Sequence, residues 1–158
     1  MKNTITIKRD ELQQQIDLRN YYMGESAKRK DIDAATMQSS KDDEELLYMF
    51  IRRACNELVT AVALRFPYIS GNVGNDTIDI SFETESAYPE HLLPMLRQSI
   101  SDYFVNEAIM QWLLVRRPEM AQSYISLRAS LYNNVQHLFG KIYSRKKLRR
   151  RATDLAGI

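Results

Sequence analysis

The sequence predicts a mainly α fold: a helical bundle with a long antiparallel helix hairpin and a small β-hairpin or sheet insertion. Apolar residues recur at every third or fourth position through most of the chain, which is the spacing of an amphipathic helix. Only two short segments, 4–7 and 77–83, alternate polar and apolar residues as strands do. Pro118 leaves a short connection between the last two helical segments, and such a connection favours an antiparallel pair.

Length and composition are those of one folded domain. The chain has 158 residues, of which 44% are apolar and 27% are charged. We expect a single helical domain over residues 1–151 and a flexible C-terminal tail over 152–158. The N-terminal segment lacks the apolar core of a signal peptide, and no stretch approaches the about 18 apolar residues of a spanning helix. We therefore expect a cytoplasmic protein without membrane contact.

The N-terminal part is predicted as a strand, a helix and a linker. Thr4–Ile7 is the strand, and a helix follows from about Asp10 with Leu12, Ile16 and Met23 on its inner side. Gly24 ends that helix in this interpretation and opens a polar linker over residues 25–41.

A second helix is predicted from about Lys41 to Arg65. Ser40 and Asp43 have the spacing of a capping box, in which two side chains satisfy free backbone groups at a helix start. Phe66-Pro67 ends the helix, because the residue before proline is disfavoured in the helical conformation. The expected core positions of this helix are Leu47, Ile51, Ala54, Leu58 and Val62.

A β insertion is predicted over residues 68–83. Ser70–Asp76 is dense in turn-forming residues, and Thr77–Glu83 then alternates with Ile78, Ile80 and Phe82 on one side. A strand needs a partner, and the sequence leaves three open: the Tyr68 region, the N-terminal strand, or another subunit.

Two long helices complete the chain. The first is expected from about Pro89 to Arg116, with Leu93, Leu96, Ile100, Phe104, Ala108, Trp112 and Val115 facing inward. The second is expected from about Pro118 to at least Lys147. Its apolar residues Met120, Tyr124 and Leu127 recur eleven residues later as Leu131, Val135 and Leu138, and Ile142 begins a third round. This period of about 3.67 residues per turn favours a nearly straight helix packed on a globular body over a coiled coil.

No pattern in the chain indicates catalysis. The sequence lacks a P-loop, a dinucleotide fingerprint and any paired-histidine metal motif. His91 and His137 lie on different helices, and Cys55 is expected to be a buried structural thiol. We therefore expect a non-enzymatic protein with no catalytic, cofactor-binding or metal-binding residues and no small-molecule substrate.

The C-terminal end is strongly basic. Residues 141–158 carry seven basic and one acidic side chain, which leaves 15 basic and 19 acidic side chains in residues 1–140. Continuing the apolar spacing past Ile142 places Lys146 and Arg149 where core residues would lie, so the helix is expected to run beyond its own domain. Solvation, binding to phosphates, and contact with an acidic partner surface all remain open. The candidate contact residues are Lys141, Arg145, Lys146, Lys147, Arg149, Arg150 and Arg151.

The organisation as a whole resembles the small head-to-tail connector, or adaptor, proteins of tailed bacteriophages and prophages. The shared features are the polar excursion 25–41, the β insertion 68–83, the helix pair 89–147 and the basic end. The resemblance implies a structural virion protein in a ring of identical subunits, with portal and tail proteins as partners and non-specific contact with DNA. Its location would be the host cytoplasm and then the virion. The alternative is a small helical nucleic-acid-binding or regulatory protein that uses the basic helix directly.

Overall fold

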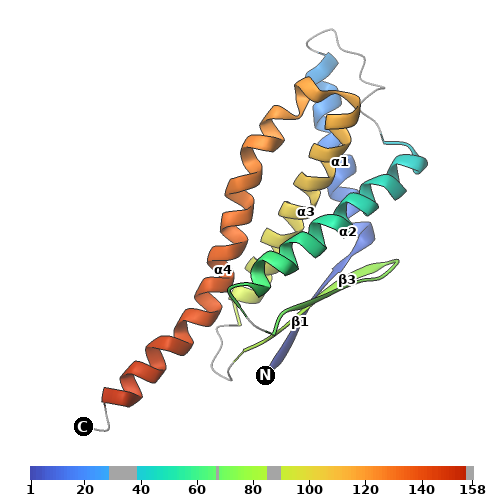
Figure 1. Ribbon diagram of the computed structural model, residues 1–158. Helices are drawn as coiled ribbons and strands as arrows, with labels where there is room; N and C mark the ends of the chain where they lie inside the picture. Colours follow the sequence, from blue (N-terminus) through green and yellow to red (C-terminus); the bar gives the residue numbers. More distant parts are fainter. Residues whose placement is uncertain (29–38, 67, 85–89, 156–158) are drawn as a thin grey trace.

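The computed structural model is mainly helical with one small sheet, as predicted (Figure 1). It describes residues 1–28, 39–66, 68–84 and 90–155. The elements in chain order are β1 (Lys2–Lys8), α1 (Arg9–Lys28), α2 (Lys41–Ala63), β2 (Ser70–Val73), β3 (Thr77–Glu83), α3 (Leu92–Arg116), the 3-10 helix η2 (Pro118–Met120) and α4 (Gln122–Leu155).

The three strands form an antiparallel sheet in the order β1-β3-β2. Both expected strand partners within the chain are therefore used, and β3 is paired along both of its edges without another subunit. Ile5 faces Ile80 and Ile7 faces Ile78 in the register, and all four side chains are buried. The opposite face is polar: the Thr6 hydroxyl donates to Asp79 at 2.6 Å. One covered and one solvated face is the usual state of a small antiparallel sheet.

Helix α2 begins at the predicted capping box. The Asp43 N–H donates to the Ser40 hydroxyl at 3.3 Å, and the Ser40 N–H donates to the Asp43 carboxylate at 2.8 Å. All five predicted core positions of α2 are buried, as is Cys55. The helix ends at Ala63, two residues before the predicted end at Arg65.

Helix α1 is longer than predicted. It continues through Gly24, which is buried, to Lys28, so the expected linker start at residue 25 was wrong. Tertiary contacts explain the difference, because Met23 and Ser26 lie across from the start of α4 and a packed helix tolerates a single glycine. Residues 29–38 of the predicted linker lie outside the described residues, and Ser39 donates to Asp17 of α1 at 3.1 Å.

Helix α3 is the central helix of the bundle and packs against α1, α2 and α4 (Figure 1). It begins at Leu92, later than the predicted Pro89, which lies outside the described residues. Six of its seven predicted inward positions are buried or half-buried. Val115 is the exception, with 73% of its surface exposed, because α3 is near its end there.

Helix α4 returns antiparallel to α3 after the short η2 turn (Figure 1). Val135, Leu138 and Ile142 are buried as predicted, whereas Leu127 is 44% exposed, so the predicted apolar stripe is only partly covered. Phe139 was not among the predicted core residues, but it is buried and stacks on Phe66 with 6.3 Å between ring centroids. The helical backbone continues to Leu155, four residues past the predicted domain end at 151.

Candidate functional site

The last turns of α4 extend beyond the bundle and the sheet (Figure 1). Ile142 is buried in the last turn of α4 whose side chains are described, and Phe139 packs against Phe82 at 5.6 Å between ring centroids. The backbone then stays helical for 13 more residues, about 20 Å at the helical rise. We call residues 143–155 of α4 the arm.

The predicted contact residues therefore gather on one helical segment. Lys141 is exposed in the last packed turn of α4. The other six lie within the arm, whose side chains are outside the described part: Arg145, Lys146, Lys147, Arg149, Arg150 and Arg151. Seven cations thus fall within about 15 Å of helix, a charge density that suits an anionic partner.

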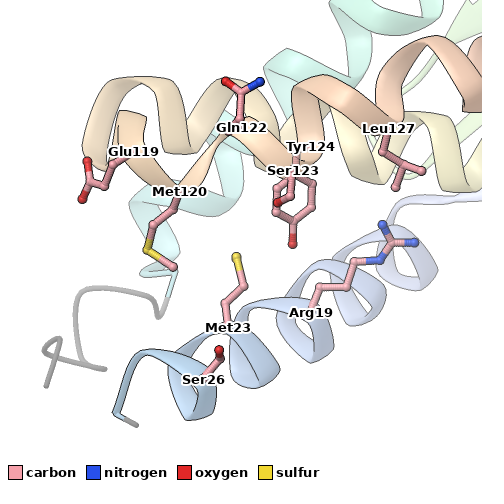
Figure 2. A pocket seen from close by; sticks show the side chains of 9 residues that line it. All are labelled: Arg19, Met23, Ser26, Glu119, Met120, Gln122, Ser123, Tyr124 and Leu127. Carbon is pink, nitrogen blue, oxygen red and sulfur yellow. The ribbon is translucent and has the colours of Figure 1, made fainter. Parts of the chain in front are cut away.

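A groove of about 600 Å³ lies between α1 and the start of α4 (Figure 2). Met23 reaches toward the groove from α1, while Met120, Tyr124 and Leu127 line the opposite wall. Arg19 lies at one end and pairs with Asp102 of α3 at 3.5 Å. Sequence patterning missed this groove, because it depends on how closely two helices approach, which local spacing does not encode.

Asp43 joins α2 to α3 in a nearly buried polar cluster. Its carboxylate accepts from Trp112 Nε1 at 3.3 Å and pairs with Arg116 at 2.5 Å. Burial raises the pKa of Asp43, but the hydrogen bonds from Ser40 and Trp112 and the Arg116 charge together hold that pKa below its usual value. The cluster ties together one helix start and one helix end, which is a structural role.

Glu107 forms the second buried charged cluster. It is 3% exposed and pairs with Arg128 of α4, with 2.5 Å between Oε1 and Nε. Burial raises the pKa of Glu107 despite the nearby Arg128 charge, and burial also raises the pKa of the neighbouring Tyr103 to about 12. A half-exposed guanidinium on a buried carboxylate links α3 to α4.

The remaining reactive side chains are apart from one another. Cys55 is buried as predicted, and burial raises the pKa of its thiol to about 11, so it is a poor nucleophile at neutral pH. His91 is exposed at the N-cap of α3, and His137 is exposed on α4. Within the described ranges, no three His, Cys, Asp or Glu side chains gather as metal ligands.

Comparison with known proteins gives no relative for this chain: no family model, no curated protein and no solved structure matches it. In the described part of the chain, none of the helices has both the length and the apolar character that crossing a membrane requires.

Proposed function

We propose that this protein is a non-catalytic structural subunit that assembles with copies of itself through the arm. The observation that carries the proposal is the course of α4, whose last turns extend past the bundle and the sheet (Figure 1). The arm continues the packed turns of α4 and needs no new nucleation, but most helical stability in proteins comes from tertiary packing.

The charge pattern of the arm adds to the need for a partner. Arg145–Arg149, Lys146–Arg150 and Lys147–Arg151 are like-charge pairs four residues apart, and such pairs destabilise an isolated helix. An anionic surface against the arm relieves this repulsion. Residues 1–140 carry an excess of four acidic side chains, so a second copy of the chain supplies such a surface.

A ring-forming subunit of the head-to-tail connector type is the assembly we propose. This extends the resemblance in organisation, with portal and tail proteins as further partners, and it places the protein first in the host cytoplasm and then in the virion. Non-specific contact with DNA passing through the ring is compatible with the basic arm.

The second candidate function is direct binding of nucleic acid by the arm. The specific observation in its favour is the concentration of seven cations within eleven residues on a projecting helix. Neutralising several phosphates would give an affinity that falls steeply as salt rises.

Two measurements on the full chain separate these functions. Sedimentation velocity over a concentration series tests assembly, and fluorescence anisotropy with a labelled DNA duplex tests binding at physiological salt. The proposal predicts concentration-dependent assembly with weak DNA affinity. A chain that stays monomeric and binds the duplex tightly at physiological salt, with an affinity that falls steeply as salt rises, would support the nucleic-acid function instead.

A further inference from the structure

The outer side of α1 carries large apolar side chains that nothing in the described structure covers. Leu18, Tyr21 and Tyr22 are 55%, 58% and 64% exposed and occupy positions i, i+3 and i+4 on one side of the helix. The core-facing residues Leu12 and Ile16 lie on the opposite side. The two tyrosine rings contact each other edge to face at 5.7 Å. We call Leu18, Tyr21 and Tyr22 the α1 outer face.

Two acidic side chains lie on α1 near the α1 outer face. Asp10 and Asp17 are exposed, and among the described residues the donors that reach Asp17 are the neutral side chains of Gln13 and Ser39. Two of the three cations of α1 are engaged elsewhere, and the side chain of the third, Lys28, lies outside the described part. Arg9 pairs with Glu45 of α2 at 2.6 Å, and Arg19 pairs with Asp102 of α3.

These features define the chemistry of the ligand. Tyrosine rings attract cations to their faces, and the carboxylates add to that attraction. The exposed apolar area requires an apolar surface as well. A helix that is both basic and apolar fits this face.

The arm has this composition. Leu148, Ala152 and Leu155 are spaced i, i+4 and i+7, which places them on one side of the helical backbone. Arg145 and Arg149 occupy positions beside that row. The sequence of the arm therefore combines an apolar row with flanking cations.

The α1 outer face and the arm of one chain cannot meet. Met23 of α1 lines the groove with Leu127, near the start of α4 (Figure 2). Leu155 is 28 residues further along the same helix, which is about 40 Å at the helical rise. Figure 1 accordingly shows the arm at the opposite end of the molecule from the end of α1. A contact between the two surfaces must join two copies.

We propose that the arm of one subunit binds the α1 outer face of the next, an inference that rests on the proposed self-assembly. The contact joins two different surfaces of the same chain. Such a heterologous contact produces a ring when the rotation closes and a filament when it does not.

Two full-length variants test the contact. Leu18→Lys with Tyr22→Lys makes the α1 outer face cationic, and Arg145→Glu with Leu148→Glu and Arg149→Glu makes the arm acidic. Leu64→Lys with Val115→Lys is the matched control, because these two side chains are 85% and 73% exposed at other places. Far-UV circular dichroism and the fluorescence of the buried Trp112 check that each variant is folded.

Each variant alone should lose assembly, with an apparent dissociation constant raised by about tenfold or more, while the control assembles like the wild type. An equimolar mixture of the two variants restores one intact arm and one intact α1 outer face. The mixture should therefore associate at concentrations at which each variant alone stays monomeric.

The outcomes separate the two proposals. Assembly of the α1 variant at the wild-type concentration, or two monomeric variants that fail to pair, overturns the contact and leaves self-assembly intact. A wild-type chain that remains monomeric at every concentration overturns the proposed function itself.

Discussion

At the scale of single residues, Asp43 shows how one side chain can serve two elements. It closes the capping box of α2 with Ser40 and also accepts from Trp112 and Arg116 of α3. The capping role was predictable from the spacing of Ser40 and Asp43. The contacts with α3 were not, because 69 residues separate Asp43 from Trp112 and no local pattern links them.

Replacing Asp43 by alanine should lower the free energy of unfolding by about 2–4 kcal/mol, through loss of the cap and an unpaired buried indole N–H. Urea unfolding measures this. Asp42→Ala is the control, since Asp42 is exposed in the same turn and should change stability by no more than about 0.5 kcal/mol. Equal effects of Asp43→Ala and Asp42→Ala would contradict this role.

Because the pKa of Asp43 is lowered in the folded state, the stabilisation by its charged carboxylate is present above about pH 4 and disappears below that pH.

Glu107 should show the opposite pH dependence. Its pKa is raised in the folded state, so the stabilisation is complete below its ordinary value of 4.5 and is lost as the pH rises through the folded value. Glu107→Gln removes this titration while keeping the side-chain shape. The stability of the wild type relative to Glu107→Gln should therefore fall between acidic and neutral pH in urea unfolding experiments. A wild type that gains stability over the variant as pH rises would refute the raised pKa.

At the scale of elements, sequence patterns predicted those helices and strands whose formation depends mainly on residues close together in the chain. The alternation of 77–83 marked β3, and the spacing of Leu47 to Val62 marked the buried side of α2. The end of α1 and the burial of Leu127 were predicted wrongly, because both depend on how closely α1 approaches α4. The projection of α4 was predictable, since cations replace apolar residues after Ile142. The α1 outer face was not, because three apolar residues on a helix do not by themselves reveal which side is covered.

Two leucines of α4 that differ in burial provide a matched pair of substitutions. Leu138 is 3% exposed and Leu127 is 44% exposed on the same helix. Leu138→Ala should cost about 2–5 kcal/mol, as buried leucine truncations do, whereas Leu127→Ala should cost about 1 kcal/mol or less. Chemical unfolding of both variants checks the difference, and similar losses would mean that the groove between α1 and α4 is closed in solution.

Removing the arm should leave the bundle folded. Deletion of Arg145–Ile158 removes turns that extend past the bundle and the sheet (Figure 1), and it keeps the buried side chains of Phe139 and Ile142. The far-UV spectrum of the remaining domain should keep its helical shape, and its melting temperature should match that of the dilute full-length chain. A large fall in the melting temperature of the monomer would instead make the arm part of the fold.

At the scale of the whole molecule, the distribution of charge and the shape of the chain both favour the proposed self-assembly. The basic arm leaves the bundle at one end and α1 ends at the other (Figure 1), with the apolar and aromatic α1 outer face in the second half of α1. A chain with complementary surfaces at its two ends is suited to join copies of itself in sequence. Attraction between such surfaces also makes assembly sensitive to ionic strength, because exposed charges are screened over about 10 Å at 0.1 M salt.

The molar mass of the full-length chain, measured by light scattering after size-exclusion chromatography over a concentration series, tests this account most directly. We predict one defined species of more than two copies at physiological salt, which dissociates on dilution and at high salt and does not form when the arm is acidic. A chain that elutes as a monomer at every concentration, or whose assembly survives reversal of the arm charges, would contradict the account.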